Sequence, residues 1–427
     1  MEQCNVKDKF ADIKLALEKA RIQQSEMIKL TTEQKNSVLL HLAKNIKENT
    51  NHILQANSKD ISNAMQKGLA TNLIDRLSLN NERIEAMIAG INNVINLEDE
   101  VLKVIDEKTN QANGLNIKRI RVPIGIILMI YESRPNVAID ASILCFKSAN
   151  GVVLKCGSDS LETSSYLFDL WLKSFDDAGL GEFKECFLLL NPKDRELTGQ
   201  VLHLDSLIDL VIPRGGKNLV KFISENSKIP LLKHLDGNCH LYIHSKANLS
   251  RALDVLINAK MRRTSVCGAT ESLLVDKEIA NFFIPMAIKA LKENNCEIVA
   301  CKETLNIEPS VKEARDDDYY TEFLDSKISI KIIDNLDAAI NHINKYSSHH
   351  TDSIITEDKE AADTFVKCVD SAITMHNAST QFADGGELGL GVEIGISTNK
   401  LHARGPVALE GLTTYKFVVT GDYSLRK

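Results

Sequence analysis

Hydrophobic residues recur every three or four positions through the first hundred residues of the chain. The spacing is clearest at 7–21 and 32–54, where Lys, Glu and Gln fill the positions between the apolar ones. This is the pattern of amphipathic helices. Two further helices of the same kind extend it to about residue 97, so the sequence predicts a helical region with a charged surface.

Beyond residue 110 the spacing becomes that of strands. Residues 115–122 alternate apolar with polar side chains and are rich in Lys and Arg, which suits an edge strand or an arm between subunits. Short apolar runs follow at 125–131, 151–155, 186–190 and 207–212, with helical patterns at 140–149, 159–178, 193–202 and 217–227. A second series has strands at 241–243, 271–275 and 328–333 and helices at 249–262 and 279–294. This alternation predicts an α/β protein with two parallel-sheet domains covered by helices on both faces.

The composition and net charge of the chain argue against nucleic acid and membranes as binding partners. The chain has 427 residues, with 51 Lys and Arg against 58 Asp and Glu and a formal charge of −7. Such a chain lacks the positive field that binding to nucleic acid or to an anionic membrane surface needs. Its longest apolar stretch, 126–130, is far short of the roughly 18 residues of a membrane span. The first residues contain no secretory signal pattern, so we expect a cytoplasmic protein without nucleic-acid or membrane partners.

Nine cysteines are scattered along the chain without a CxxC pair, which favours neither a metal site nor a disulfide framework. One of them stands apart. Cys267 follows Lys260, Arg262 and Arg263 and is embedded in small residues, an environment that favours an accessible thiolate. Taken alone, the segment is better explained as a loop with an inconsequential cysteine.

Three other segments carry candidate chemistry. Residues 209–217 run from a strand through Gly215 and Gly216 into a helix, which suits either a phosphate site or an ordinary turn. Asn136 follows an apolar strand, where an amide can donate to an oxyanion, although a Pro-Asn turn explains it more simply. The glycine-rich 384–393 and Arg404 suit a wall over an anionic substrate, but flexible loops are also common.

Together these segments resemble a known family. The motifs are IYESRPNV (130–137), LVIPRGG (210–216), NAKMRRTSVCGATESLLVD (258–276), NASTQFADGGELGLG (377–391) and STNKLHARGPVALEGLTTYK (397–416). They are similar to those of the γ-glutamyl phosphate reductases, the proline-pathway branch of the aldehyde dehydrogenase superfamily. The match covers nearly the whole chain in the expected order.

The resemblance implies a role for each matching position. Cys267 matches the catalytic cysteine, and Asn136 matches the asparagine that stabilises the oxyanion together with the cysteine N–H. Lys155 matches the lysine at the adenosine ribose, and Glu322 the acid at the nicotinamide ribose. Gly215–Gly216 fall beside the cofactor phosphates.

Two departures from hydrolytic relatives are informative. His234 stands roughly where those enzymes place a glutamate that activates water, and a reductase acting on an acyl phosphate does not need such a base. Ser158 replaces a glutamate with which many NAD-dependent relatives hold the ribose hydroxyls. Since a serine can donate to a 2′-phosphate that an acid would repel, NADP(H) is the expected cofactor.

The expected reaction is therefore NADPH-dependent reduction of L-glutamyl 5-phosphate to L-glutamate 5-semialdehyde through a Cys267 thioester. Arg263 and Arg404 are candidate substrate-binding residues on charge alone. The alternatives are a CoA-acylating or hydrolytic aldehyde dehydrogenase of the same fold, or an inactive scaffold that partners a glutamate 5-kinase. Any kinase is expected to be a separate chain.

The resemblance also implies a domain plan. We expect a cofactor-binding domain at 1–109 and 124–238, with part of 385–400, and a catalytic domain at 239–384. Residues 110–123 and 401–427 are expected to form an oligomerisation element, giving a homodimer or a multiple of dimers.

Overall fold

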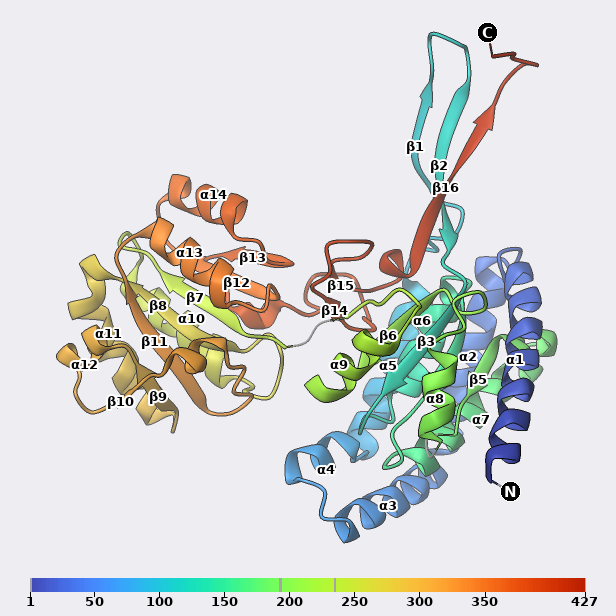
Figure 1. Ribbon diagram of the computed structural model, residues 1–427, viewed down its shortest axis with the longest axis horizontal. Helices are drawn as coiled ribbons and strands as arrows, with labels where there is room; N and C mark the ends of the chain where they lie inside the picture. The colour runs from blue at the N-terminus through green and yellow to red at the C-terminus, as the bar shows by residue number, and fades with distance from the viewer. Residues whose placement is uncertain (1, 192–193, 234–235, 427) are drawn as a thin grey trace. The chain divides into compact units, whose positions relative to one another are not determined.

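The structure is a computed structural model that describes residues 2–191, 194–233 and 236–426. The chain divides into two compact units (Figure 1). Unit 1 comprises Met1–Lys233, Leu390–Gly395 and Val407–Lys427, and unit 2 comprises His234–Gly389 and Ile396–Pro406. His234, a residue to which the sequence drew attention, lies outside the described residues.

Unit 1 is built on a four-stranded parallel sheet with the order β5-β4-β3-β6. Its strands are β3 (Ile126–Tyr131), β4 (Gly151–Lys155), β5 (Phe187–Leu189) and β6 (Leu210–Arg214). The chain passes from β3 to β4 and β5 on one side and then returns to place β6 on the other side of β3. The strand order therefore reverses between β3 and β6, and ligands of open α/β sheets bind at the carboxyl ends of the strands at such a switch point.

Helices cover both faces of this sheet (Figure 1). Ile126, Leu128 and Ile130 of β3 pack on one face against residues of α1, α8 and α9, while α6 packs against β3 and β4 and α7 against β5. The helices are α1 (Glu2–Met27), α2 (Thr32–Glu48), α3 (Thr50–Gln66), α4 (Thr71–Leu77), α5 (Asn81–Asn96), α6 (Val137–Lys147), α7 (Leu161–Asp177), α8 (Arg195–Val201) and α9 (Lys217–Asn226).

The single helix predicted over 32–54 is wrong, because the structure breaks it at Asn49. This residue has φ −108° and ψ 16°, and it serves both as the C-cap of α2 and as the N-cap of α3. Its side-chain amide donates to the carbonyl of Asn45 at 2.8 Å. Local hydrogen bonding by an Asn side chain competes with helix continuation, which the apolar spacing alone does not reveal.

An aromatic cluster fills the space beneath α6 and α7. The ring of Phe146 meets Trp171, Phe175 and Phe187 in edge-to-face contacts with centroids 5.0–6.1 Å apart. Trp171, the only tryptophan of the chain, is fully buried. Edge-to-face packing of this kind is favoured by the ring quadrupoles and adds to the area that the rings bury.

A separate antiparallel sheet of unit 1 has the order β1-β2-β16. It is formed by β1 (Val104–Thr109), β2 (Asn116–Pro123) and β16 (Thr413–Thr420), and it projects from the rest of the unit (Figure 1). We call it the arm. Tyr415, Phe417 and Val419 are 51%, 60% and 55% exposed on it.

Unit 2 contains a seven-stranded parallel sheet with the order β10-β9-β11-β8-β7-β12-β13. The strands are β7 (Cys239–Ile243), β8 (Thr270–Asp276), β9 (Glu297–Ala300), β10 (Lys312–Glu313), β11 (Lys327–Ile333), β12 (Thr351–Ile355) and β13 (Ile373–His376). The helices are α10 (Leu249–Met261), α11 (Lys277–Glu293), α12 (Lys302–Ile307), α13 (Leu336–Tyr346) and α14 (Lys359–Cys368), and β14 (Ile396–Ser397) pairs with β15 (Gly405–Pro406).

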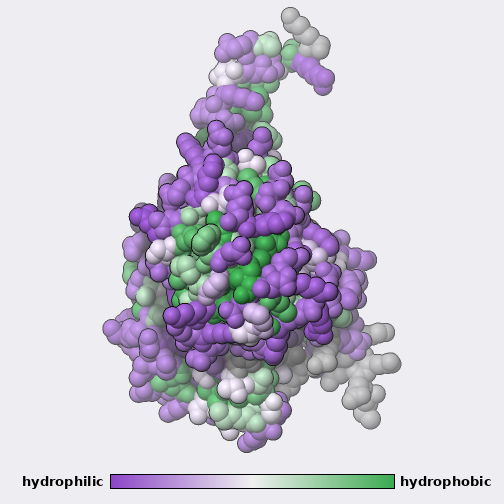
Figure 2. Space-filling view, turned by 90° about the vertical axis from the view of Figure 1, so that its left-hand side faces the viewer, coloured by the Kyte–Doolittle hydropathy of each residue, from purple (hydrophilic) through white to green (hydrophobic). Residues whose placement is uncertain are grey.

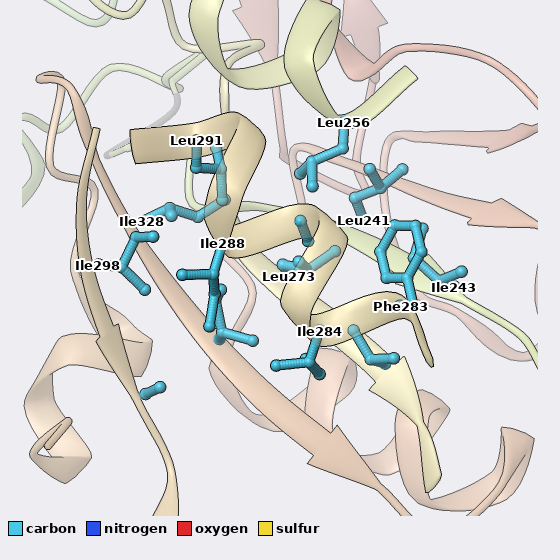
Figure 3. Close-up of a cluster of buried hydrophobic side chains, with 14 of the residues drawn as sticks. Leu241, Ile243, Leu256, Leu273, Phe283, Ile284, Ile288, Leu291, Ile298 and Ile328 are labelled. Carbon is cyan, nitrogen blue, oxygen red and sulfur yellow. The ribbon is translucent and has the colours of Figure 1, made fainter. Parts of the chain in front are cut away.

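The central strands of this sheet are buried on both faces. Leu241 and Ile243 pack under α10 and α11, in the cluster shown in Figure 3, whereas Tyr242 between them packs toward α13 and α14. Leu273 and Leu274 of β8 divide between the two faces in the same way. Alternation of side-chain direction therefore gives each strand two apolar faces, as a helix-covered parallel sheet requires.

The outer surface of unit 2 carries both hydrophobic and hydrophilic residues. Figure 2 shows a side of the molecule on which hydrophobic residues gather at the centre and hydrophilic residues surround them. On α11, Phe282 is 70% and Met286 39% exposed. Among the described helices, none is long and apolar enough to cross a membrane.

The predicted fold class is confirmed: two parallel-sheet α/β units and a small antiparallel sheet. The functions predicted for these parts of the chain, including oligomerisation through the arm, stay predictions.

Candidate active site

The polar residues of unit 1 that the sequence singled out gather at the switch point of its sheet. Asn136 follows β3, and Gly215 and Gly216 follow β6, which pairs directly with β3. Lys155 ends β4, the neighbour of β3 on its other side. Because all of these strands are parallel, their carboxyl ends lie along one edge of the sheet.

The turn after β3 is held in an unusual backbone conformation. Ser133 has φ 48°, in the left-handed region that few non-glycine residues adopt, and it is buried. Its hydroxyl donates to the carboxylate of Asp159, in the loop after β4. A β-carbon on Gly157 would lie 2.1 Å from Oδ1 of that carboxylate, so a side chain there would displace Asp159. Asp159 thus fastens the turn that carries Asn136 to the loop that carries Ser158.

Asn136 is the N-cap of α6 but does not use its side chain as a cap. Its amide nitrogen donates instead to Oδ2 of Asp140, one helical turn further on, at 2.8 Å. Burial raises the pKa of the Asp140 carboxyl to about 6, against the opposing effects of this hydrogen bond and of Arg214 at the end of β6. The sequence drew no attention to Asp140.

The start of α9 has no side-chain cap on the helix. Gly216 is its N-cap, and a β-carbon on Gly216 would meet nothing within 4 Å. The Gly216 N–H donates to Oε2 of Glu132 at 3.1 Å. A β-carbon on Gly215 would lie 2.5 Å from the same oxygen, so a side chain there would displace Glu132. The chain's own carboxylate thus already lies at a helix N-terminus that attracts negative charge.

Lys155 and Ser158 begin and end a short stretch after β4. Lys155 is half-buried and Ser158 is exposed. Between them, the pKa of the Cys156 thiol is raised to about 11, chiefly by burial, so this cysteine is protonated at neutral pH. Cys156 is therefore an inert neighbour of the two residues that the resemblance assigns to the cofactor.

In unit 2, Cys267 lies in the loop that joins α10 to β8. Among the described cysteines, five are buried, Cys301 and Cys267 are half-buried, and Cys368 is exposed at the end of α14. The Cys301 thiol lies at the N-cap of α12 and accepts from the Ile332 N–H at 3.4 Å. Cys267 is thus a half-buried thiol at the amino end of a central strand.

Gln381 fixes the path of the Cys267 loop. Its amide nitrogen donates to the carbonyls of Asn258, Ala259 and Arg263 at 2.9–3.3 Å, and its amide oxygen accepts from Nε of Arg262 at 2.8 Å. These contacts hold the end of α10 and the chain that leaves it. They also explain why the NASTQF motif accompanies the cysteine motif, a connection that sequence reasoning did not make.

Gly237 packs directly against the backbone of Cys267. A β-carbon on Gly237 would lie 2.1 Å from the Cys267 carbonyl oxygen and 2.6 Å from its Cα, so only glycine fits. The Gly237 N–H donates to Oε1 of Glu322 at 2.8 Å. Glu322 and Cys267, which the resemblance assigns to cofactor and nucleophile, are therefore joined through one glycine.

Buried polar contacts support this arrangement. The Cys239 thiol donates to the Cys267 carbonyl at 3.1 Å, and burial raises its pKa well above the usual range, which keeps it protonated. Lys260 and Glu271 form a fully buried ion pair at 2.6 Å, and Glu271 also accepts from the Leu324 N–H at 3.4 Å. The pair therefore ties α10 and β8 to the chain segment that carries Glu322.

The two arginines proposed for the substrate differ in their surroundings. Arg263 is exposed, and its guanidinium has no ion pair among the described residues. Arg404 donates from Nη2 to the Asp370 carboxylate at 2.9 Å and to the Asp370 carbonyl at 3.2 Å. Lys400 pairs with the same carboxylate at 2.5 Å, and these two cations lower its pKa. The Nη2 donor of Arg404 is therefore already engaged by Asp370.

The structure thus gathers the candidates into two sets. Unit 1 holds Asn136, Lys155, Ser158, Gly215 and Gly216, and unit 2 holds Cys267, Glu322, Arg263 and Arg404. Among the described residues no group of three or more His, Cys, Asp and Glu side chains could hold a metal ion.

Comparison with known proteins shows what this chain is similar to. Residues 4–327 match the aldehyde dehydrogenase family. A γ-glutamyl phosphate reductase of Caldanaerobacter subterraneus subsp. tengcongensis is 44% identical over 97% of this chain and 100% of its own length. One of Zymomonas mobilis is 45% identical over 96% of this chain and 95% of its own. The crystal structure of the enzyme of that name from Thermotoga maritima superposes with a TM-score of 0.93 at 42% identity, covering 96% of this chain and 99% of that one.

The packing of Gly237 can be tested by adding one carbon. We expect G237A to destabilise unit 2 by about 1–3 kcal/mol, because the new methyl group overlaps the Cys267 backbone. G199A, in α8 where a β-carbon meets nothing within 4 Å, is the matched control. Urea denaturation followed by far-ultraviolet circular dichroism measures both. Equal stability of G237A and wild type would contradict the close contact.

Proposed function

The chain belongs to the aldehyde dehydrogenase family and, within it, to the γ-glutamyl phosphate reductases, and on that premise we propose that Cys267 is its nucleophile. Enzymes of this family make L-glutamate 5-semialdehyde from L-glutamyl 5-phosphate in proline biosynthesis. The observation that carries the proposal is the position of Cys267. Its thiol is half-buried in a loop whose backbone is held by Gly237, Gln381 and Cys239.

The first step is transfer of the acyl group to sulfur. The Cys267 thiolate attacks the γ-carbonyl carbon of L-glutamyl 5-phosphate, a C–S bond forms, and the C–O bond to phosphate breaks. Phosphate leaves with the electron pair of that bond. The resulting thioester then accepts a hydride at the same carbon, and its collapse expels the thiolate and releases the aldehyde.

Both steps pass through a tetrahedral oxyanion. We assign its stabilisation to the Asn136 side-chain amide and the Cys267 N–H. Donors that are fixed before the reaction lower the barrier without reorganisation, and removal of one such donor slows comparable enzymes by about 10²- to 10³-fold.

The residues of unit 1 fit a phosphorylated dinucleotide. The open start of α9 offers backbone N–H groups, and its Gly216 N–H already binds the Glu132 carboxylate. Lys155 and Ser158 place a cation and a hydroxyl donor in the loop after β4, and Ser158 is exposed. These residues would hold NADP(H), which supplies the hydride when bound. Glu322 would hold the nicotinamide ribose, which requires the Glu322 carboxylate to accept from a hydroxyl as well as from Gly237.

Hydrolysis and CoA acylation remain the competing reactions. A hydrolytic enzyme needs a carboxylate base near the thioester, and the sequence has His234 at the corresponding position.

We assign recognition of the substrate's anionic groups first to Arg263, since Arg404 is already paired with Asp370. We also place the enzyme in the cytoplasm, where its many thiols stay reduced.

We propose further that the arm joins protomers into a homodimer or a multiple of dimers. Its strand β16 exposes Tyr415, Phe417 and Val419, and an isolated three-stranded sheet with exposed apolar residues gains stability when a second chain covers it. A glutamate 5-kinase, the source of the acyl phosphate, would be a separate partner.

Replacement of the nucleophile tests the mechanism. We expect C267A to bind NADPH as wild type does and to lose semialdehyde oxidation by NADP⁺ in the presence of phosphate, because no thioester can form. Fluorescence titration and absorbance of NADPH measure the two properties. Wild type is assayed with phosphate, with CoA and with neither. Turnover by C267A would overturn the mechanism, and phosphate-independent turnover by wild type would favour the competing reactions.

Introduction of an acid tests the cofactor site. We expect S158E to weaken NADPH binding by about tenfold or more relative to NADH, because its carboxylate would repel the 2′-phosphate. S58E adds the same charge at an exposed position of α3 and is the control. Titration with both nucleotides gives the ratio. An unchanged ratio of the NADPH and NADH affinities would mean that the 2′-phosphate does not bind near Ser158.

Disruption of the arm tests the assembly. We expect F417D to yield smaller species than wild type, because burial of the new charge between protomers is costly. F282D, on an exposed residue of α11, is the control. Size-exclusion chromatography with light scattering gives the masses. A monomeric wild type would refute the assignment.

A further inference from the structure

We propose that Asp140 is a positioning residue that keeps the Asn136 amide turned with its nitrogen toward the oxyanion. The inference rests on the role assigned to Asn136 under the proposed function. It adds a residue to the reaction that acts only through another side chain, without contact to substrate or cofactor.

Asn136 is the N-cap residue of α6, but its side chain does not make the hydrogen bond that is usual at this position. An Asn at the N-cap ordinarily accepts from the backbone N–H two or three residues later through its side-chain oxygen. Here that bond is absent, and Nδ2 donates to Asp140 Oδ2 at 2.8 Å. The backbone of Asn136 is itself helical, with φ −59° and ψ −27°, so its side chain is not placed to cap the helix and is oriented by the carboxylate instead.

This matters because the two ends of an amide have nearly the same shape and opposite hydrogen-bonding character. Only the NH₂ end can stabilise an oxyanion, whereas the carbonyl end would repel it. An ionised carboxylate accepts hydrogen bonds and cannot donate one, so it selects the NH₂ end of its neighbour. One N–H of Asn136 binds Asp140, and the second is left for the oxyanion.

Protonation of Asp140 removes this selection. A carboxylic acid O–H can donate to the amide oxygen and so stabilise the reversed orientation, in which Asn136 turns its carbonyl toward the oxyanion. Burial raises the pKa of Asp140 to about 6, so the protonated form is populated as the pH falls through that value. The oxyanion donor is thus fully oriented above this pH and progressively lost below it.

Few charged groups act on this carboxyl. Arg214 at the end of β6 favours its ionised form, as does the Asn136 hydrogen bond. Helices α2, α5 and α7 and strands β3 and β4 also pack against α6. Among the described residues they supply no charged side chain that shifts the Asp140 pKa. The raised pKa of Asp140 is therefore set by burial of this carboxyl, and Arg214 is the charged group that opposes the increase.

The test uses two substitutions with different consequences. D140L removes the acceptor, and we expect kcat to fall by about tenfold or more across the pH range, which corresponds to the loss of one oriented hydrogen bond. D140N keeps an acceptor oxygen but cannot ionise. Because its side-chain NH₂ can donate to the Asn136 oxygen, as the protonated acid does, we expect its kcat at neutral pH to fall to about the value that wild type reaches below pH 6, and the decline of kcat near pH 6 to disappear.

Phosphate titrates in the same range, so the readout is the difference between the profiles of wild type and D140N in the same buffers. D169N, at an exposed carboxylate of α7, is the control and should reproduce the wild-type profile. KM for the semialdehyde and the NADPH dissociation constant, measured by fluorescence, should change by less than about twofold in D140L and D140N, because the proposal has Asp140 act through Asn136 and not on a ligand.

A double-mutant cycle separates this inference from the proposed function. We expect D140L to have no further effect on kcat in the N136A background. If N136A itself retains wild-type kcat, the role of Asn136 fails. If N136A is impaired while D140L is not, or if D140L lowers kcat equally in both backgrounds, Asn136 keeps its role and the positioning by Asp140 is refuted.

Discussion

The interaction on which the rest of the molecule depends is the parallel pairing of strands that are apolar on both faces. Where helices cover both faces of a sheet, groups that bind a ligand from solvent can lie only at the ends of its strands. In unit 1 the ends that matter are the carboxyl ends, at the switch point between β3 and β6. In unit 2 they are the amino ends, since Gly237 precedes β7, Cys267 precedes β8 and Glu322 precedes β11.

Much of this architecture is predictable from the sequence, for physical reasons. Alternating apolar runs and amphipathic helices give two α/β units, and glycines after β6 mark a helix start open to anions. The prominence of Cys267 follows from its small and basic neighbours. The location of Cys267 at the amino end of a strand also follows, because the residue falls between the predicted helix 249–262 and the predicted strand 271–275. Contacts between residues far apart in sequence are invisible, as with Gln381 and the end of α10, or Gly237 and the Cys267 backbone.

The ion pairs of the basic residues are also not visible in the sequence. The net charge of −7 describes the whole chain, and the motifs supply basic residues that sequence reasoning assigns to anionic ligands. The structure shows that two basic residues of the motifs are already paired: Lys260, a basic neighbour of Cys267 in sequence, with Glu271 in the core, and Arg404, a candidate for the substrate, with Asp370. A buried cation left without its partner is costly, so such pairs are fixed by folding as much as by function. Sequence patterns count basic residues, whereas only the fold shows which of them are still available.

The aromatic cluster of unit 1 has a consequence for following the two units separately. Trp171 is the only tryptophan of the chain, and its indole is buried against Phe146, Phe175 and Phe187. Indole emission excited at the red edge of the absorption band therefore comes from unit 1 alone, and it reports the interior beneath α6, the helix that follows Asn136. Unit 2, which contains the proposed nucleophile, has no tryptophan and does not contribute to this emission. Tryptophan fluorescence therefore follows the unfolding of unit 1 separately from that of unit 2.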